Sequence, residues 1–312
     1  MAGRAGKRPQ APAAAPGRRV TEHHVIASGG FSAGIRALGA ELTSLRDDRG
    51  AEWLWQAGPE WRRHAPVLFP IVGRLAGDRL RHAGREHRLT QHGFARDRRF
   101  AWVRRDADRC RLRLADDAAS RDAFPFGFVL ELDYALAGPR LTVTAILSNP
   151  GAEPLPCALG AHPAFRWPLP HGPGERPAEK AAHRLVLERA EAGPLRRLRD
   201  GLLRPEPEPP PFAERVWPLS PDLFAGDALI LPRLASRAIR FEAPGRGLTL
   251  SWEGYRDLGL WSKPEGADFL CIEPWYGMAS PEGWQGDFVD KPGLMLLAPG
   301  ESRRLAWSVA LD

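Results

Sequence analysis

Residues 128–147 read FVLELDYALAGPRLTVTAIL, and this stretch decides the fold class. Apolar side chains occupy every second position on both sides of the Gly138-Pro139 pair, and acidic residues or threonines stand between them. A period of two places the apolar side chains on one face of a strand, and a Gly-Pro pair favours a tight turn. The stretch therefore predicts a long antiparallel hairpin that packs one face on a core.

Similar short apolar segments, separated by turns, occupy most of the chain from about Val20 onward. We predict further strands within residues 31–40, 41–46, 53–55, 98–104, 110–115, 228–231, 238–241, 248–252, 258–261, 269–272, 294–297 and 305–311. No long segment shows the period of a helix, and the proline-rich residues 170–215 exclude long elements. Many strands without a dividing linker indicate an all-β sandwich or barrel that forms one domain over residues 20–312.

The charge pattern argues against a nucleic-acid partner. The chain of 312 residues has 44 basic and 38 acidic side chains, a net charge of +6. Its basic residues are interleaved with acidic ones, as in RRDADR at 104–109, and form no basic stripe of the kind that nucleic-acid binding needs. No apolar run approaches the length of a membrane-spanning helix. We therefore expect neither a nucleic acid nor a membrane as a partner.

The three cysteines, Cys110, Cys157 and Cys271, show no CxxC spacing. An odd number without that spacing predicts neither a disulfide framework nor a metal site, and reduced thiols are typical of a cytoplasmic protein. Residues 1–19 consist mainly of Ala, Pro, Gly and Arg and contain no apolar segment. They predict a disordered N-terminal extension rather than a secretory signal.

Residues 271–278, CIEPWYGM, contain the first candidate for a functional group. An apolar run ends at Glu273, and Pro274 cannot donate a ladder hydrogen bond, so we expect the strand to end or to lie at a sheet edge there. Trp275 and Tyr276 then add aromatic surface, which raises the pKa of a nearby carboxyl and suits a general acid or base. The alternative is a carboxylate at the rim of a sheet, with the aromatic rings in a core.

Two histidines and an arginine lie in comparable positions, each beside an apolar run and a turn-forming residue. His92 lies in QHGFARD, residues 91–97, and His162 lies in GAHPAF, residues 160–165. Arg74 ends the run PVLFPIVGR, so its donors lie at the rim of buried surface, where they suit sugar hydroxyls or a carboxylate. The alternatives are histidines that satisfy loop carbonyls and an arginine in a structural ion pair.

In chain order PVLFPIVGR, QHGFARD, GAHPAF and CIEPWYG, these four motifs resemble the aldose 1-epimerase (galactose mutarotase) superfamily, and its LacX-like branch in particular. LGAELTSL at 38–45 and WLWQ at 53–56 are similar to the same branch. The resemblance extends from about Val20 to the C-terminus and is weakest in residues 170–215. It implies a large antiparallel β-sandwich of the galactose mutarotase type. It also implies an enzyme that interconverts the α and β anomers of a free aldose without a cofactor or a metal.

The resemblance further implies a role for each polar residue. Glu273 is expected to be the general base, His162 the general acid, and His92 and Arg74 sugar-binding residues. In such a reaction the base removes the anomeric hydroxyl proton while the acid protonates the ring oxygen, and the opened aldehyde recloses on its other face. We therefore expect the carboxylate and the imidazole on opposite sides of the anomeric centre.

Three aromatic residues near the motifs, Trp275, Trp261 and Phe94, are candidates to stack on a sugar, with core packing as the alternative. The better-known galactose mutarotases have a further aspartate that binds sugar hydroxyls, and this sequence offers no clear match for it. The corresponding stretch is LGLWSK, residues 258–263, where Lys263 would contact the ligand instead.

The expected function is that of an aldose 1-epimerase for an aldohexose, with a small sugar as its partner and a monomer or homodimer as its assembly. Arg74, Arg96 and Arg166 near the motifs also allow a hexose-6-phosphate 1-epimerase, because guanidinium groups bind phosphate well. A non-catalytic carbohydrate-binding protein of the same fold is a second alternative. The presence of Glu273 with both histidines disfavours it, because a binding protein needs no acid and base together.

Overall fold

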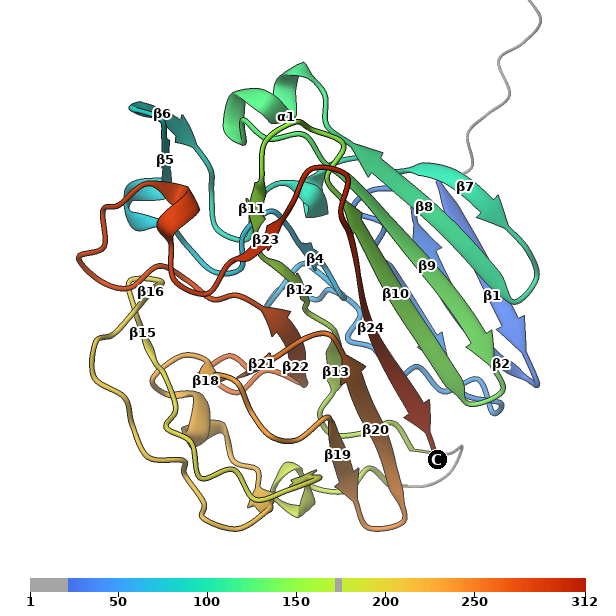
Figure 1. Ribbon diagram of the computed structural model, residues 1–312. Coiled ribbons are helices and arrows are strands. Elements are labelled where there is room, and N and C mark those ends of the chain that lie inside the picture. The colour runs from blue at the N-terminus through green and yellow to red at the C-terminus, as the bar shows by residue number, and fades with distance from the viewer. Residues whose placement is uncertain (1–21, 172–175) are drawn as a thin grey trace, which may run out of the picture.

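The computed structural model describes residues 22–171 and 176–312 of the chain. The predicted N-terminal extension, residues 1–19, lies outside the described residues. Two large antiparallel sheets dominate the fold, and a three-stranded sheet packs against the larger one (Figure 1). This arrangement confirms the predicted all-β sandwich. Within the described ranges, no helix has the length and apolar character needed to cross a membrane.

The larger sheet has nine strands, in spatial order β17 (Val216–Pro218), β14 (Arg184–Leu187), β19 (Ala238–Ala243), β20 (Arg246–Glu253), β24 (Ser302–Leu311), β10 (Arg140–Ser148), β9 (Val129–Ala137), β8 (Arg109–Ala115) and β7 (Ala101–Arg105). The second has six: β18 (Leu229–Leu231), β21 (Asp257–Trp261), β22 (Phe269–Tyr276), β12 (Leu159–Ala161), β4 (Val67–Leu68), and β13 (Ala164–Arg166), which also pairs with β22.

The smaller elements complete the fold. The three-stranded sheet contains β1 (His23–Ser28), β2 (Phe31–Arg36) and β3 (Leu42–Arg46). The remaining strands pair in twos: β5 (Arg79–His82) with β6 (Arg85–Arg88), β11 (Leu155–Cys157) with β23 (Met295–Leu297), and β15 (Leu198–Arg199) with β16 (Leu202–Leu203). The helices are the short α1 (Ala118–Ala123) and single 3₁₀ turns at Ala76–Asp78, Ala95–Asp97, Lys180–Ala182, Pro221–Phe224 and Phe288–Asp290.

The hairpin predicted from residues 128–147 lies within the larger sheet. β9 and β10 pair antiparallel, with Leu136 opposite Leu141 and Tyr134 opposite Val143. These side chains are buried in one continuous core, and β24 extends the same ladder on the other side of β10. Burying one leucine or valine side chain contributes about 1.5–3 kcal/mol. The alternating face of this hairpin therefore contributes to the free energy that joins the layers.

Residues 53–55 differ from the prediction, because they form no strand. Leu54 makes an isolated bridge to Phe165, and the buried Trp53 donates from Nε1 to Asp47 Oδ2 at 3.0 Å. Backbone hydrogen bonds from Trp53 to Leu45 and from Trp55 to Ala164, together with side-chain packing, hold this segment although it forms no regular strand. In the described part of residues 170–215, the elements are short, as their prolines predict.

β22 runs through Pro274 to Tyr276 in the interior of its sheet, so the prediction that the strand ends or lies at an edge there is wrong. Backbone N–H groups alternate between the two sides of a strand. Ile272 donates to the carbonyl of Pro163, on the side of β12 and β13. The nitrogen of Pro274, two residues further on, points to the same side. In this register Pro274 lies opposite Ala161, the last residue of β12, so the ladder lacks one donor at the end of that strand.

The two faces of β22 serve different parts of the molecule. Leu270 and Ile272 pack in the main core, whereas Cys271 and Trp275 belong to separate small clusters of buried side chains. Glu273 lies between Cys271 and Trp275, so the alternation of side chains places it on the same face as both. The carboxylate therefore points away from the main core.

Trp275 has room on this face because glycines occupy the neighbouring strands. Gly160 on β12 lies opposite Trp275, and Gly259 on β21 lies opposite Glu273. A Cβ atom at Gly259 would lie 2.4 Å from Cζ2 of Trp275, and one at Gly160 would lie 2.7 Å from its Cδ1. Both distances are far below van der Waals contact, so the position of the indole ring requires both glycines.

Replacing Gly259 with alanine should therefore destabilise the protein by about 1–3 kcal/mol, the usual cost of overpacking. Urea unfolding followed by tryptophan fluorescence measures this change. Gly193→Ala is the matched control, because a Cβ there meets nothing within 4 Å. We expect the control to stay within about 0.5 kcal/mol of the wild type. Equal stability of the two variants would show that the Trp275 ring does not depend on Gly259.

Candidate active site

Glu273 and His162 face each other across neighbouring strands. β12, which pairs Gly160 with Trp275, and β13 follow β22 in one continuous register. This register places His162 opposite Glu273, and directly opposed side chains on one face are close neighbours. His162 Nε2 lies 3.2 Å from Glu273 Oε2. The expected acid and base are thus in contact with each other, rather than on opposite sides of a space for sugar, because a cross-strand pair shares one face.

A cavity of about 280 Å³ opens over this pair. Besides the pair, its lining contains four polar side chains and three tryptophans: Gln91, His92, Arg96, Asp227, Trp61, Trp261 and Trp275. Apolar rings with a few convergent polar groups are typical of a small-molecule site. Trp61 stacks on the imidazole of His162, with ring centroids 4.9 Å apart and planes inclined by 26°. This stacking orients the imidazole next to the carboxyl group.

Burial controls the protonation of the pair. It raises the pKa of Glu273 well above the ordinary carboxyl range, an effect that the Trp275 side chain partly offsets and Asp227 reinforces. Burial also lowers the pKa of His162 to about 3, and the charge of Arg96 contributes. Both shifts favour the neutral side chains. Because the two groups are in contact, they titrate as a pair rather than independently.

His92 offers an N–H to a ligand in the cavity. Its backbone lies in the left-handed region at φ 64°, and its N–H donates to the carbonyl of Gly73 at 2.8 Å. The N–H of Gly73 in turn donates to Nδ1 of His92 at 3.1 Å. A ring nitrogen that accepts a hydrogen bond leaves the proton on the other nitrogen, Nε2. Burial, followed by the charge of His162, lowers the pKa of His92 well below its ordinary value, so the ring is a neutral donor.

The arginine of the cavity is Arg96 and not Arg74. Arg74 donates from Nε and Nη2 to the carboxylate of Asp78, at 2.7 and 3.2 Å, and does not line the cavity. The acidic residue four positions later captures the guanidinium, which is the structural ion pair that the sequence left open. Arg96 lines the cavity and donates from Nη2 to the carbonyl of Gln91 at 2.6 Å. Burial lowers the pKa of Arg96 to about 10, so it remains charged at neutral pH.

The other candidates from the sequence fall into two groups. Trp275 and Trp261 line the cavity. Lys263 and Arg166 do not: Lys263 lies in the connection between β21 and β22, and Arg166 is exposed at the end of β13. Phe94 packs against the main core.

Two residues of the cavity, Asp227 and Trp61, are not among those singled out in the sequence. Asp227 lies at φ 68° before β18, and its Oδ1 accepts a hydrogen bond from the N–H of Ala228 at 2.8 Å. In the sequence, Asp227 could be found as a carboxylate that directly precedes a predicted strand, in GDALIL. Trp61 stands in a polar loop, WRRH, whose pattern does not distinguish it. Only the folded chain brings this ring over His162.

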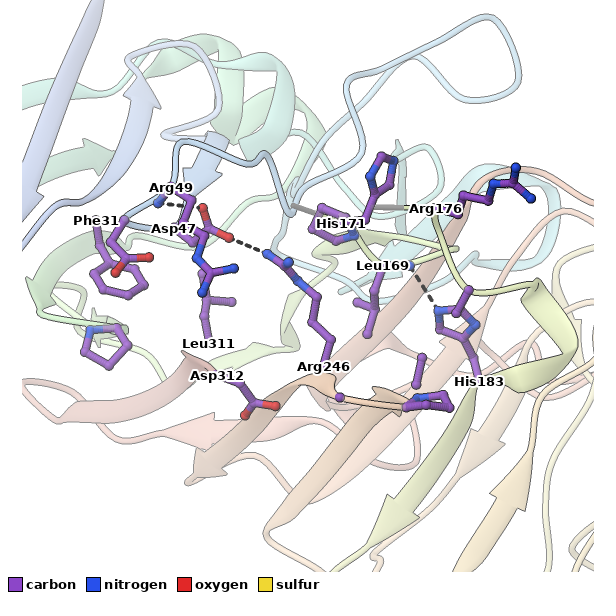
Figure 2. Close-up of a pocket in the computed structure, with 17 residues that line it drawn as sticks. Phe31, Asp47, Arg49, Leu169, His171, Arg176, His183, Arg246, Leu311 and Asp312 are labelled. Carbon is purple, nitrogen blue, oxygen red and sulfur yellow. Dashed lines mark hydrogen bonds and ion pairs between the residues drawn. The ribbon is translucent and has the colours of Figure 1, made fainter. Parts of the chain in front are cut away.

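A larger cavity of about 730 Å³ lies elsewhere in the molecule, and Figure 2 shows the side chains around it. Asp47 and Arg246 face each other there, and Asp47 Oδ2 accepts a hydrogen bond from Arg246 Nη2 at 2.5 Å. These charges compensate each other. The lining includes neither Glu273 nor His162, and it adjoins residues 172–175, which lie outside the described ranges. The smaller cavity is therefore the candidate active site.

Comparisons with known proteins extend over nearly the whole chain. A family model described as Aldose 1-epimerase matches residues 22–306. The plasmid-encoded protein LacX of Lactococcus lactis subsp. lactis is 30% identical over 288 residues, which cover 89% of this chain and 95% of LacX.

Two solved structures share the fold. A galactose mutarotase related enzyme from Lactobacillus acidophilus is 29% identical, with a TM-score of 0.83 that covers 93% of this chain and 97% of that one. A galactose mutarotase-like protein from Lactobacillus casei ATCC 334 is 30% identical, with a TM-score of 0.82 over 93% and 100% of the two chains. The length of the family match and the identity to LacX show that this chain belongs to the aldose 1-epimerase family.

Proposed function

We propose that this protein is an aldose 1-epimerase that interconverts the α and β anomers of a neutral aldohexose. The observation that carries the proposal is the pair formed by His162 and Glu273, whose Nε2 and Oε2 atoms lie 3.2 Å apart in the lining of the cavity. Membership of the family supports the class of reaction. The roles of the other residues are inferred from their places around this pair.

Contact between an acid and a base suits the two oxygens that exchange protons in this reaction. The anomeric hydroxyl oxygen and the ring oxygen are bonded to the same carbon, so the two groups must reach two neighbouring atoms. Glu273 removes the hydroxyl proton while His162 protonates the ring oxygen, and the ring opens to an aldehyde. After rotation about the C1–C2 bond, both transfers run in reverse, and the carbon–oxygen bond forms on the other face of the aldehyde.

A single shared proton provides the acid and the base together. Around neutral pH it resides on Glu273 or on His162, and it has only the 3.2 Å between Oε2 and Nε2 to cross. With the proton on His162, the carboxylate is a base and the imidazolium is an acid. Ring opening moves one proton to Glu273 and one from His162, and reclosure restores the starting state. The pair therefore completes the cycle without a net exchange of protons with solvent.

The remaining polar residues of the lining are suited to binding sugar hydroxyls. His92 donates from Nε2 and Arg96 from its guanidinium, whereas the carboxylate of Asp227 accepts. Asp227 is our candidate for the aspartate that binds sugar hydroxyls in galactose mutarotases. Trp61 and Trp275 offer ring faces to the C–H groups of the sugar.

The charges of the lining favour a neutral sugar over a sugar phosphate. Among the described residues, Arg96 is the single arginine or lysine that lines the cavity, and Asp227 and Glu273 line it as well. The two other arginines that allow a phosphate in the sequence lie elsewhere, since Arg74 is held in an ion pair and Arg166 is exposed outside the lining. Because the Glu273–His162 pair with its shared proton carries no net charge, a phosphate dianion would meet one guanidinium, whose charge Asp227 already compensates.

Polarimetry of freshly dissolved α-glucose, α-galactose and glucose 6-phosphate tests the choice of substrate. We expect kcat/KM for a free hexose to exceed that for the 6-phosphate by at least about tenfold, because the cavity would desolvate the dianion without an uncompensated cation to pair with it. Faster reaction of the 6-phosphate would contradict a neutral substrate. Acceleration of none of the three sugars would favour the non-catalytic carbohydrate-binding alternative.

Glu273→Gln should lower kcat by about 10²–10⁴-fold, because an amide cannot take up the hydroxyl proton. Sugar binding should persist, and titration followed by the fluorescence of the cavity tryptophans measures it. Glu265→Gln is the matched control, the same substitution at an exposed loop position, and it should change neither the rate nor the binding. An unchanged rate for Glu273→Gln would remove this residue from the mechanism.

The pH dependence of kcat/KM tests the shared proton, after the uncatalysed mutarotation is subtracted. Burial raises the pKa of Glu273, so the pair loses its proton at a higher pH than an ordinary carboxyl group would. Above that pKa the pair has no acid, and kcat/KM should fall about tenfold per pH unit. On the acidic side the rate should persist until the pH approaches the pKa of His162, about 3, where a second proton binds. A rate that only rises with pH would indicate a simple carboxylate base instead.

A further inference from the structure

We propose that His162, Cys271 and Glu273 bind a zinc-like divalent cation beside the cavity, and that this cation blocks the acid–base pair. The binding itself is inferred from the three side chains, whereas the inhibition rests on the proposed function. The ligand class is a borderline-soft cation that accepts nitrogen, sulfur and oxygen donors, and Zn²⁺ is its commonest biological member.

The geometry of the three side chains suits one ion. One ligand atom from each of His162, Cys271 and Glu273 can be chosen so that all three lie within 4.8 Å of one another. Tetrahedral zinc bonds of about 2.0–2.3 Å place neighbouring ligand atoms about 3.3–3.6 Å apart. The 3.2 Å between His162 Nε2 and Glu273 Oε2 is of this size. A small shift of the thiol toward the pair would complete three corners of a tetrahedron.

The burial of Glu273 Oε2 provides a second indication. Within the described ranges, this atom accepts no regular hydrogen bond, and His162 Nε2 lies 3.2 Å from it. Such atoms normally have one, because burial removes their hydration. A cation would compensate Oε2 directly. It would also bind Nε2 of His162, which leaves the proton of the neutral ring on Nδ1.

The donor set selects the kind of cation. Magnesium and calcium prefer oxygen ligands, whereas thiolate and imidazole favour zinc and its chemical relatives. Three protein ligands leave a fourth position open, as in catalytic zinc sites, and His162 and Glu273 direct it toward the cavity that they line. Binding converts the Cys271 thiol into a thiolate and releases its proton, so the affinity should increase with pH.

Strand register explains why the sequence predicts no metal site here. Cys271 and Glu273 alternate onto one face of β22, and the neighbouring strand places His162 opposite Glu273. The cation would occupy Nε2 and Oε2, the two atoms that transfer protons in the proposed reaction. Bound metal and turnover are therefore mutually exclusive.

Cobalt is the probe of choice, because a thiolate bound to Co²⁺ gives a charge-transfer band in the near ultraviolet. We expect the chelator-treated wild-type protein to show this band on titration with Co²⁺, and Zn²⁺ to displace it. Cys271→Ser should abolish the band and weaken Zn²⁺ binding by at least about tenfold. Cys157→Ser, at another buried cysteine outside the cavity lining, is the matched control and should keep both.

Polarimetry then tests inhibition separately from binding. Zn²⁺ should slow mutarotation by the wild type, and Cys271→Ser should need at least about tenfold more Zn²⁺ for the same slowing. A protein that catalyses mutarotation but shows no thiolate–cobalt band would overturn the metal site and leave the proposed function intact. A thiolate–cobalt band in a protein that does not catalyse mutarotation would overturn the proposed function and leave the metal site intact.

Retention of the band in Cys271→Ser would also overturn the proposal. If circular dichroism shows that this variant is unfolded, Cys271→Ala and His162→Gln test the same ligands. Loss of the cobalt band in a folded variant of either kind supports the site. Its persistence in both folded variants contradicts the site.

Discussion

The antiparallel register between β22 and the interrupted strand formed by β12 and β13 is the constraint on which the candidate site depends. It places His162 opposite Glu273 with 3.2 Å between Nε2 and Oε2. A slip of one residue would turn every side chain of β22 to the other face. The carboxylate would then point into the main core, and Leu270 and Ile272 would replace it in the cavity. The large apolar core, which needs Leu270 and Ile272, thus also fixes the position of the polar pair.

A proline and two glycines, residue types that are unusual inside strands, lie next to this register. Pro274 lies in the sheet interior with its nitrogen toward Ala161, the last residue of β12, next to the interruption between β12 and β13. Gly160 and Gly259 leave the space into which the ring of Trp275 extends over its neighbours. Proline and glycine normally weaken strands. Here they occur next to Glu273, where a break in the ladder and an aromatic wall create the cavity.

Burial gives the pair its chemistry. A solvated glutamate and a solvated histidine would both be charged over part of the acidic range and would exchange protons independently with water. Desolvation raises the pKa of Glu273 and lowers that of His162, which is the basis of the single shared proton that we propose. The same desolvation leaves Oε2 of Glu273 without a hydrogen-bond partner in the part of the chain that the structure describes. The proposed proton transfer and the proposed cation site thus depend on the same burial of the pair.

The sequence by itself determined the fold class and the segments from which the candidate site is built. The alternation in residues 128–147 is local, and so are the motifs that contain His92, His162 and Glu273. Tertiary structure alone decided which arginine lines the cavity. Arg74 is bound to Asp78 and lies outside the lining, whereas Arg96 is part of it. Tertiary structure also brought Trp61 over His162 and placed Asp227 in the cavity wall. These contacts join segments far apart in the chain, and strand register and loop packing set them, neither of which a local pattern encodes.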